Sequence, residues 1–256
     1  MECKKPPRIT FTNLSGVPGL FHGVFTRRGG VSAPPYESLN VGWNGDAPEA
    51  VRENLERVKA AAGVERLVAS KQVHGDVLGF IDEESMRSLE ERSPTLLAPP
   101  ADALATNLSG LGLLIKIADC QSILLADPES RIIANIHSGW RGSVLNIAGK
   151  TVKRLERFGL DPSRTLAAVS PSLGPCCAEF INFEREIPEE FWPFRVGPHH
   201  FDFWAITRSQ LLGAGLLEEH IECAARCTVC EKSEYFSYRG EHETGRMASV
   251  IGWKRP

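Results

Sequence analysis

The 256-residue sequence lacks both a run of 18 apolar residues and a strong excess of charge of one sign. Without such a run no transmembrane helix is expected, and membrane is excluded as a partner. The formal net charge of −3 provides no basic field, so nucleic acid is excluded as well. The first residues, Met1–Pro7, lack the apolar core of a secretory signal, and the cysteines number seven. These absences predict reduced thiols in a cytoplasmic protein.

The sequence also has no internal repeat, coiled coil or low-complexity tract. Apolar residues make up 42% of the chain and charged residues 24%, as in ordinary globular proteins with a large core. We therefore expect one domain over residues 1–256, of the α+β class, in which helices cover a mixed sheet.

Hydrophobic periodicity indicates where the elements lie. Apolar β-branched runs predict buried strands at 111–117 and 131–136, the second following a turn at Asp127–Ser130. Asp46 and Glu49 have the spacing of a capping box, which predicts a helix from Asp46 to Gly63. The other expected elements are strands within 8–25 and 65–82 and at 166–169, 235–239 and 244–251, and helices at 83–91, 145–159, 186–192 and 202–213.

Three residues of metal-binding type are expected at strand ends. Cys120 and His137 each follow an apolar strand, and His74 lies in the strand-like stretch upstream. A cysteine and two histidines are ligands that zinc takes, and three of them leave the fourth position open, as in catalytic sites. Their spacings of 46 and 17 residues match no local zinc motif, so a buried core cysteine and hydrogen-bonded histidines are the competing interpretation.

Two segments have features of anion sites. Trp140-Arg141-Gly142 stands where a strand becomes a helix, so free backbone N–H groups are expected there. Arg27 precedes the pair Gly29-Gly30, which permits close approach of a ligand to the backbone. The alternatives are a salt bridge for Arg141 and a hairpin turn for the glycine loop.

The chain resembles the YfiH-like family, also called laccase-domain or polyphenol oxidase proteins. The motifs that carry this resemblance run through nearly the whole chain in order: Thr26–Ser32, Ser38–Asn40, Val73–Gly75, Ala118–Cys120, His137–Gly142, Gly174–Cys177, Asp202–Trp204, Cys227–Cys230, Phe236–Arg239 and Thr244–Met247. The resemblance implies a single domain with a layered α-β-β-α sandwich fold. It also implies a zinc site formed by His74, Cys120 and His137.

The same resemblance implies purine nucleoside chemistry, with purine nucleosides and phosphate as partners. The implied reactions are phosphorolysis of adenosine, inosine, guanosine and methylthioadenosine, and deamination of adenosine, for which zinc would lower the pKa of water to about 7. We assign Asp119 to proton transfer, although adjacent strand residues normally point to opposite faces. Arg141 or Arg27 would hold phosphate, and Arg27, Asn40 and Arg246 would contact substrate.

Two positions depart from the family pattern. Gln121-Ser122 stands where a pair such as Leu-Pro is common, and Lys116 stands where a small polar residue is usual. Lys116 lies four residues before Cys120, so strand alternation predicts that both side chains share a face. A lysine in the site would change substrate preference or the pKa values of its neighbours.

The older laccase label does not fit the histidine content. Multicopper oxidases need about ten histidines, several in His-X-His pairs, whereas this chain has seven and no such pair. Copper binding in vitro remains compatible with a soft cysteine and two imidazoles. A second metal at His199-His200 with Asp202 is less simple than Asp202 acting as a helix cap.

The remaining cysteines are interpreted as packed or redox-active thiols. Cys223, Cys227 and Cys230 have the spacing of a radical-SAM cluster, but the repeated βα units of that fold are absent. We expect packing, or a redox pair of Cys227 with Cys230, and buried thiols at Cys176-Cys177.

Three readings of the function stay open at this point. The leading one is a zinc-dependent purine nucleoside enzyme, either a monomer or a small homo-oligomer. The second is a hydrolase, of deamidase or peptidoglycan-editing type, with Cys120 as nucleophile and His137 as base. The third is a non-enzymatic protein in which the metal is structural.

Overall fold

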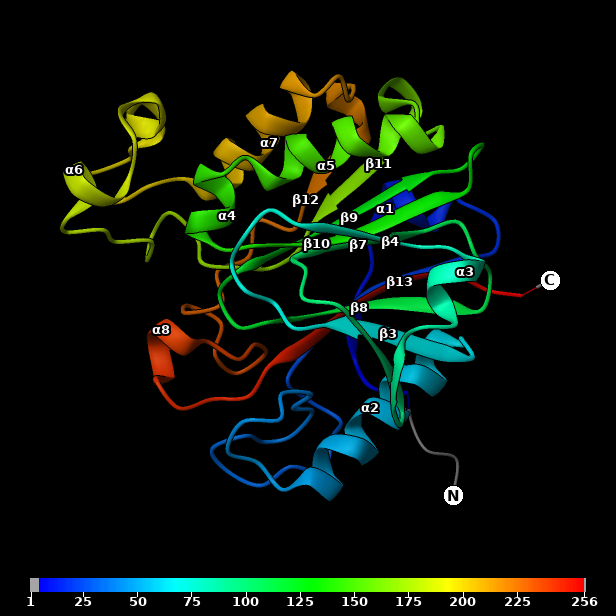
Figure 1. Ribbon diagram of the computed structural model, residues 1–256. Coiled ribbons are helices and arrows are strands. Elements are labelled where there is room, and N and C mark those ends of the chain that lie inside the picture. Colours follow the sequence, from blue (N-terminus) through cyan, green and yellow to red (C-terminus); the bar gives the residue numbers. More distant parts are fainter. Residues whose placement is uncertain (1–4, 256) are drawn as a thin grey trace.

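Two mixed β-sheets pack face to face in the computed structural model, which describes residues 5–255 (Figure 1). The first sheet has, in spatial order, β1 (Arg8–Ile9), β2 (Leu20–Phe25), β13 (Met247–Trp253), β8 (Leu111–Ile117), β3 (Arg66–Ser70), β6 (Thr95–Ala98) and β5 (Glu90–Arg92). The second sheet has β12 (Ile221–Cys223), β11 (Leu166–Val169), β9 (Gln121–Asp127), β10 (Ile132–Ser138), β7 (Ala103–Thr106) and β4 (Leu78–Ile81).

Helices cover the outer face of each sheet. The α-helices are α1 (Thr12–Ser15), α2 (Pro48–Ala62), α3 (Glu83–Met86), α4 (Trp140–Val144), α5 (Ile147–Leu155), α6 (Phe183–Glu186), α7 (Phe203–Gly213) and α8 (Tyr238–Glu241). Short 3-10 helices lie at Glu156–Phe158, Pro162–Arg164, Glu189–Phe194 and Glu218–His220. Helix α2 packs on the first sheet, and α5 and α7 pack on the second (Figure 1). None of the helices in residues 5–255 is both long and apolar enough to cross a membrane.

Strand alternation divides the core into layers. Ile115 of β8 and Leu124 of β9 point into the space between the sheets, whereas Leu114 packs toward α2 and Leu125 toward α5. Because β8 and β9 are buried on both faces, their sequences are continuously apolar rather than alternating. The predicted α-β-β-α sandwich with mixed sheets is confirmed.

Several predicted elements are wrong in detail. Asp46 does not cap α2: the residue before the helix is Ala47, and the Asp46 carboxylate accepts a hydrogen bond from the Asn40 side chain. The stretch 65–82 is interrupted by a loop at residues 71–77, and 83–91 contains only the single turn α3 before β5. Residues 235–239 are not a strand, because their buried aromatics belong to a loop that leads into α8.

The segment expected to form two strands between 111 and 136 forms three. Strand β8 ends at Ile117 in the first sheet, and β9 begins at Gln121 in the second. Residues 118–120 therefore cross from one sheet to the other, with Asp119 at a φ of 82°. Helix 186–192 is also only partly formed, as α6 and a following 3-10 helix.

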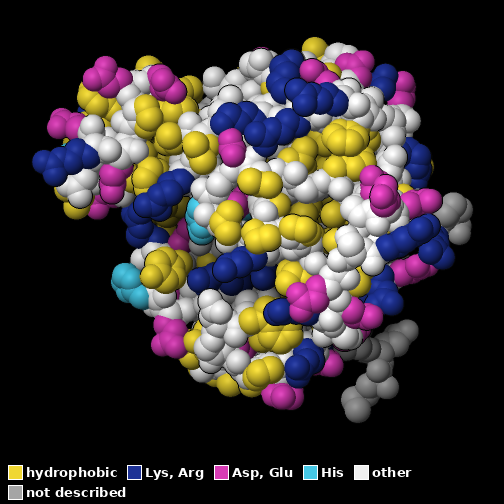
Figure 2. All heavy atoms as spheres, viewed as in Figure 1, with side chains coloured by type: hydrophobic (Ala, Val, Ile, Leu, Met, Phe, Trp, Pro, Cys, Tyr) yellow, Lys and Arg dark blue, Asp and Glu magenta, His cyan; other side chains and the backbone are white. Residues whose placement is uncertain are grey.

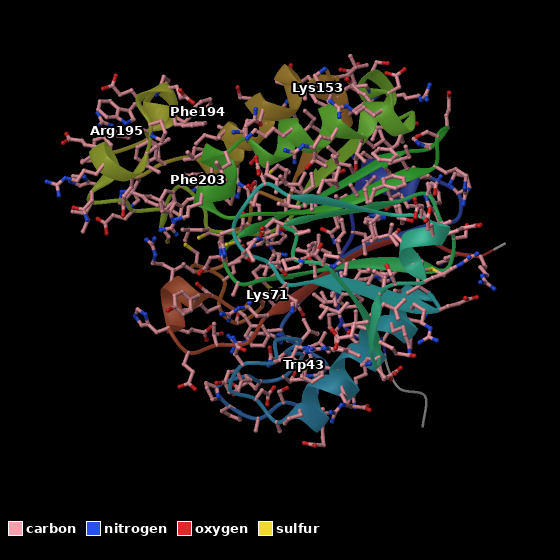
Figure 3. All side chains as sticks on the ribbon, viewed as in Figure 1. Trp43, Lys71, Lys153, Phe194, Arg195 and Phe203 are labelled. Carbon is pink, nitrogen blue, oxygen red and sulfur yellow. The ribbon has the colours of Figure 1, made fainter. Side chains whose placement is uncertain are left out.

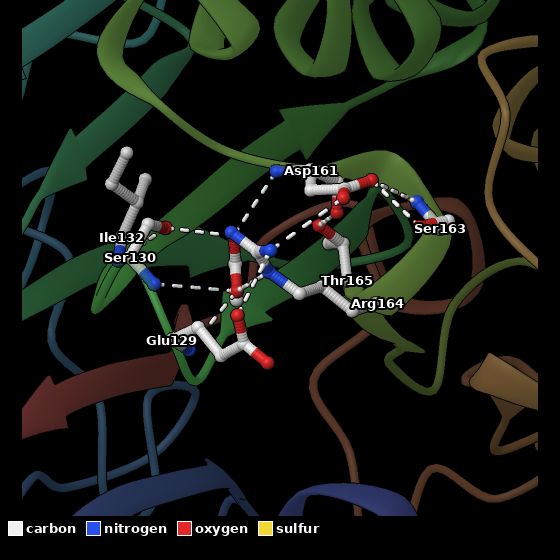
Figure 4. Close-up of polar contacts among 8 residues, drawn as sticks. Glu129, Ser130, Ile132, Asp161, Ser163, Arg164 and Thr165 are labelled. Atoms are coloured by element: carbon white, nitrogen blue, oxygen red, sulfur yellow. Dashed lines mark hydrogen bonds and ion pairs between the residues drawn. The ribbon is translucent and has the colours of Figure 1, made fainter.

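A buried carboxylate closes the turn between β9 and β10. Asp127 is fully buried and accepts hydrogen bonds from Ser130 Oγ at 2.8 Å, from Asp161 N at 3.0 Å and from Arg164 Nε at 2.9 Å. Figure 4 shows Arg164 reaching from its 3-10 helix toward this turn, where it also pairs with Glu129 at 2.9 Å. The contact ties β9–β10 to the segment that leads into β11.

Polar side chains also join the two sheets in the core. Asn135 of β10 donates from its amide to the carbonyl oxygens of Leu113 and Ser249, which belong to the other sheet. Ser122 donates to Asn135 or Ser249 through its hydroxyl at 2.6 and 2.7 Å. Its neighbour Gln121 hydrogen-bonds to Phe203 O and to a threonine of α7. The unusual Gln121-Ser122 pair thus serves core connections.

Candidate functional site

The sheet-to-sheet crossover brings the three predicted ligands together. Cys120 ends the crossover, His137 lies on β10 and is buried, and His74 lies in the loop 71–77 with a φ of 60°. Their donor atoms all lie within 4.8 Å of one another, and His74 Nε2 is 4.0 Å from Cys120 Sγ. His74 is thus a strained loop residue and not the strand-end residue that the sequence predicts. Strand alternation alone does not reveal this position.

Asp102, which precedes β7, orients both histidines. Its carboxylate is fully buried and lies 2.9 Å from His137 Nδ1, so the other ring nitrogen of His137 is free to face Cys120. The same carboxylate accepts hydrogen bonds from the backbone N–H groups of Val73, His74 and Gly75 at 2.8 to 3.2 Å. Sequence analysis missed this residue; its only signal is a lone acid directly before an apolar strand.

These contacts set the charge state of the cluster. Burial opposes ionisation of Cys120, but hydrogen bonds with His137 and His74 outweigh it and lower its pKa to about 6. Burial also opposes a charged His137, but hydrogen bonds with Asp102 and Cys120 outweigh burial and raise its pKa to about 9. At neutral pH the sulfur is therefore a thiolate, which is the form that binds metals.

Gly139 leaves room beside the three ligands. A Cβ atom at this position would lie 3.0 Å from Cys120 Sγ and 3.2 Å from His74 Cδ2. A side chain would fill the space that the sulfur and the imidazole face. The sulfur and two imidazole nitrogens, the hydrogen bond between His137 Nδ1 and Asp102, and the gap at Gly139 together fit a zinc site with three protein ligands and an open fourth position.

A basic cleft of about 700 Å³ opens on one side of Cys120. Its cationic lining residues include Lys71, Lys116 and Arg246. Lys71 and Trp43, which both line this cleft, are labelled in Figure 3, and Figure 2 shows Lys and Arg side chains beside hydrophobic ones near the middle of the same face. Burial lowers the pKa of Lys116, and the Arg246 guanidinium lowers it further. Lys116 shares this cleft with Cys120 and is poorly hydrated, but the two do not share a strand face as predicted, because β8 ends at Ile117.

A separate apolar pocket of about 170 Å³ is also lined by Cys120. Its aromatic lining includes Trp140, Phe180 and Phe203, and Phe203, labelled in Figure 3, is the first residue of α7. Arg239 lines it as well. Cys120 lines both the apolar pocket and the basic cleft, which differ in chemistry, whereas His74 and His137 line the cleft.

Asn40 and Arg246 both line the basic cleft. Asn40 is buried, and its side chain is fully used: it accepts from Gly42 N and Arg246 N and donates to Gly42 O and Asp46. Arg246 donates to the carbonyl oxygens of Thr244 and Gly245. Asn40 positions Arg246 through the Arg246 backbone N–H. Arg246 and Lys116 line the same cleft as the three ligands.

Arg27 has other contacts. Its guanidinium donates to the carbonyl oxygens of Glu37 and Lys232, pairs with Glu241 at 2.9 Å and lies 4.5 Å from the centre of the Phe236 ring. These contacts join the loop after β2 to the segment before α8. Arg27 is not among the residues that line either space.

Asp119 lines the apolar pocket together with Cys120. Its carboxylate accepts hydrogen bonds from Thr228 Oγ1 at 2.6 Å, Ser237 Oγ at 2.7 Å and Arg239 N at 2.6 Å. Asp119 lies in the crossover with a φ of 82°, not on a strand, so strand alternation does not set the direction of its side chain. The carboxylate anchors the wall that carries Tyr238 and Arg239 over the site.

Arg141 is exposed on α4, and its guanidinium lies 4.3 Å from the centre of the Trp140 ring. Within residues 5–255 it takes part in no ion pair and lines neither the cleft nor the apolar pocket. The strand-to-helix junction itself is present, with Gly139 before the first turn of α4. The structure thus brings together Asn40, Arg246 and the three ligands, and leaves Arg27 and Arg141 outside.

The comparisons with known proteins give one consistent result. Residues 21–254 match the family described as multi-copper polyphenol oxidoreductase laccase. The chain is 34% identical to the purine nucleoside phosphorylase of Deinococcus radiodurans, covering 91% of this chain and 89% of that protein. It is also 34% identical to the purine nucleoside phosphorylase YfiH of Escherichia coli, covering 88% of this chain and 90% of the relative.

The crystal structure of YlmD from Geobacillus stearothermophilus has the same fold, with a TM-score of 0.86, 31% identity and coverage of 100% of this chain and 98% of that one. A Bacillus licheniformis YfiH structure gives a TM-score of 0.81 at 29% identity, covering 92% and 93%. The chain therefore belongs to the YfiH-like family of laccase-domain proteins.

Proposed function

We propose that this protein is a zinc-dependent purine nucleoside phosphorylase. The observation that carries the proposal is the position of Cys120, which borders both the basic cleft and the aromatic pocket. Phosphorolysis needs an anion and a flat base on opposite sides of the bond that breaks. The relatives named purine nucleoside phosphorylase support the same assignment.

Phosphate is assigned to the basic cleft, beside Lys116 and Arg246. A poorly hydrated ammonium next to a guanidinium attracts a multiply charged anion, which in turn would raise the pKa of the lysine. Asn40 positions Arg246 through the Arg246 backbone N–H. Arg27 and Arg141 remain predicted phosphate ligands from the sequence, but their present contacts favour Lys116 and Arg246 for that role.

The purine base is assigned to the aromatic pocket, where Phe180, Phe203 and Trp140 offer apolar faces. The sugar would then lie at the ligand cluster, with its C1′ atom between base and phosphate. A phosphate oxygen forms the new bond to C1′, the bond from C1′ to N9 breaks, and the base leaves with a proton. The products are the free base and ribose 1-phosphate.

Zinc is the metal we assign to His74, Cys120 and His137. When bound, it would supply Lewis-acid polarisation and a lowered pKa of water, which deamination of adenosine also requires. Asp102 holds both histidines in place for it, and Asp119 holds the wall that closes the site. The same three ligands are compatible with copper in vitro.

Adenosine, inosine, guanosine and methylthioadenosine are the proposed substrates for phosphorolysis, and adenosine for deamination. The test uses protein of known zinc content, incubated with each nucleoside with and without phosphate. We expect base release only with phosphate, and inosine formation from adenosine without it. A folded, zinc-loaded sample that produces neither contradicts the proposal.

Lys116 allows a sharper test of the phosphate position. We expect Lys116→Met to raise the KM for phosphate at least 10-fold while the KM for the nucleoside changes little, and Lys116→Arg to recover part of the loss. Because the lowered pKa of Lys116 removes its proton earlier as pH rises, phosphate KM should increase on the alkaline side in the parent protein. Lys150→Met, on the surface of α5, is the control. Equal phosphate KM values in all variants would place the anion elsewhere.

A hydrolase with Cys120 as nucleophile is the second candidate, because Cys120, His137 and Asp102 also form a thiolate–imidazolium–carboxylate series. Iodoacetamide distinguishes the two. Rapid alkylation of Cys120 in zinc-loaded protein would favour the nucleophile, whereas protection that disappears on chelation favours coordination.

A further inference from the structure

Four cysteine thiols meet at a second place in the molecule. Cys176 and Cys177 follow Gly174-Pro175, and Cys227 and Cys230 lie in the turn after β12. All four sulfur atoms lie within 4.8 Å of one another, although the two pairs are about fifty residues apart in sequence. Cys223, which shares the sequence spacing of a radical-SAM motif, is not in this group. We propose that these four cysteines bind a structural zinc ion.

The distances fit one tetrahedral ion. Cys230 Sγ is 3.5 Å from Cys176 Sγ and 3.7 Å from Cys177 Sγ. A tetrahedral site with zinc–sulfur bonds of about 2.3 Å places its sulfur atoms about 3.8 Å apart. The separations exceed the bond of about 2.05 Å in a disulfide, and all four cysteines are free thiols. Four soft sulfur ligands in this geometry select zinc over hard cations such as magnesium.

The surroundings of the cluster match a closed structural site. Cys227 is buried, and its sulfur accepts a hydrogen bond from Gly174 N at 3.4 Å. Cys176 and Cys230 are exposed, so an ion can enter from solvent. With four protein ligands no position remains open for substrate, in contrast to the site at Cys120.

The ion would fix the wall of the aromatic pocket. Ser172 pairs with Cys227 across the two segments, and Thr228 donates to Asp119, the neighbour of Cys120. On the other side, Arg239 donates to the carbonyl oxygens of Cys177 and Glu179. Zinc at the cluster therefore joins residues 172–180 to residues 226–239, from which Leu173, Phe180 and Arg239 line the pocket.

Metal counting in a Cys120→Ser background tests the proposal independently of the nucleoside site, because that substitution removes the other thiolate. We expect the single variant, reduced and reconstituted with zinc, to hold one zinc per chain. Adding Cys176→Ser and Cys230→Ser should abolish this zinc, whereas adding Cys223→Ser should preserve it. A Cys120→Ser chain with no zinc, or zinc unchanged by the Cys176→Ser and Cys230→Ser substitutions, overturns the proposal.

Alkylation of the unmodified protein avoids any folding defect of the variants. Zinc-loaded protein is treated with iodoacetamide under native, reducing conditions before and after chelation, and the labelled cysteines are located by mass spectrometry. We expect Cys176, Cys177, Cys227 and Cys230 to become reactive only after chelation, while Cys223 reacts equally in both samples. Equal reactivity of exposed Cys176 and Cys230 in both samples would show that they hold no ion.

Discussion

Asp102 positions two of the three ligands, His74 and His137, through its hydrogen bonds. One buried carboxylate fixes the ring of His137 and three consecutive N–H groups around His74. A ligand loop with a positive φ at His74 is stable only where such contacts hold it. The position of His74 therefore depends on a residue 28 positions away in sequence.

Asp102→Asn should weaken zinc binding by about 10- to 100-fold, because the amide cannot act as a carboxylate acceptor for His137 and all three backbone donors. The measurement is zinc affinity by competition with a chelator of known affinity. Asp82→Asn, at the exposed cap of α3 outside the site, is the control and should leave the affinity unchanged. Equal affinities for Asp102→Asn and the parent would contradict the role given to Asp102.

For Asp119, the contacts in the structure favour a different role from the proton transfer that the sequence predicts. Its three hydrogen bonds favour a positioning role in place of proton transfer. Asp119→Asn should lower kcat/KM by about 10- to 100-fold at every pH, because the amide group would face the N–H of Arg239 and displace the wall. Loss of one limb of the pH profile, with the rest unchanged, would instead show that Asp119 carries a proton. Asp82→Asn, at an exposed helix cap, is the control.

At the scale of elements, the strands buried on both faces were predictable and their junctions were not. The run at 111–117 is the strand expected, and so is 166–169, because burial on both faces leaves a continuous apolar signature. The crossover at 118–120 has no such signature, since it depends on the next strand entering a different sheet. Asp46 shows the same limit: the capping spacing was present, but Asn40 engages the carboxylate.

The residues of the candidate site also divide into those that the sequence identifies and those that it does not. Residue type and the family resemblance sufficed to select the three residues that the structure brings together, because few residue types bind zinc. Asp102, Lys71 and Tyr238 could not be selected, since their roles arise from loops that fold together. The four-cysteine cluster was equally hidden, because adjacent thiols at Cys176-Cys177 match no common zinc spacing.

The turn between β9 and β10 gives a prediction about pH. Burial raises the pKa of Asp127, but hydrogen bonds from Arg164, from backbone N–H groups and from Ser130 outweigh it, so the pKa is lowered overall (Figure 4). A lowered folded-state pKa stabilises the protein above the unfolded value of about 3.9, and this contribution disappears as pH falls through the folded-state pKa.

Asp127→Asn should therefore reduce the free energy of unfolding at pH 7 by about 1–3 kcal/mol, and the difference from the parent should shrink below pH 4. Urea unfolding at several pH values measures it. Glu129→Gln, an exposed partner of the same arginine, serves as the control and should change stability by less than about 1 kcal/mol. A difference that stays constant from pH 7 to pH 3 would exclude the charge of Asp127 as its cause.

At the scale of the whole molecule, the register of the two sheets against each other places the cations of the basic cleft relative to the ligands. Cys120 directly precedes β9, which pairs with β10 and its His137 within the second sheet, whereas Lys116 lies on β8 of the first sheet. Sliding between the layers therefore moves Lys116 relative to the ligands. Apolar packing between the sheets is adaptable and does not by itself select one register. Asn135 favours one register of the two sheets, because its side-chain amide donates hydrogen bonds to two backbone carbonyl groups of the opposite sheet.

Asn135→Ala should destabilise the protein by about 1–3 kcal/mol, because two buried carbonyl groups and the Ser122 hydroxyl lose a partner. Asn107→Ala, at an exposed position, should change stability by less than about 0.5 kcal/mol. Since Ser122 and Asn135 share one network, Ser122→Ala combined with Asn135→Ala should cost less than the sum of the single changes. Additive losses would mean that the two residues act separately. If the network sets the register, Asn135→Ala should also raise the KM for phosphate in protein that remains folded, because Lys116 lies on the opposite sheet, and an unchanged KM would limit the role of Asn135 to stability.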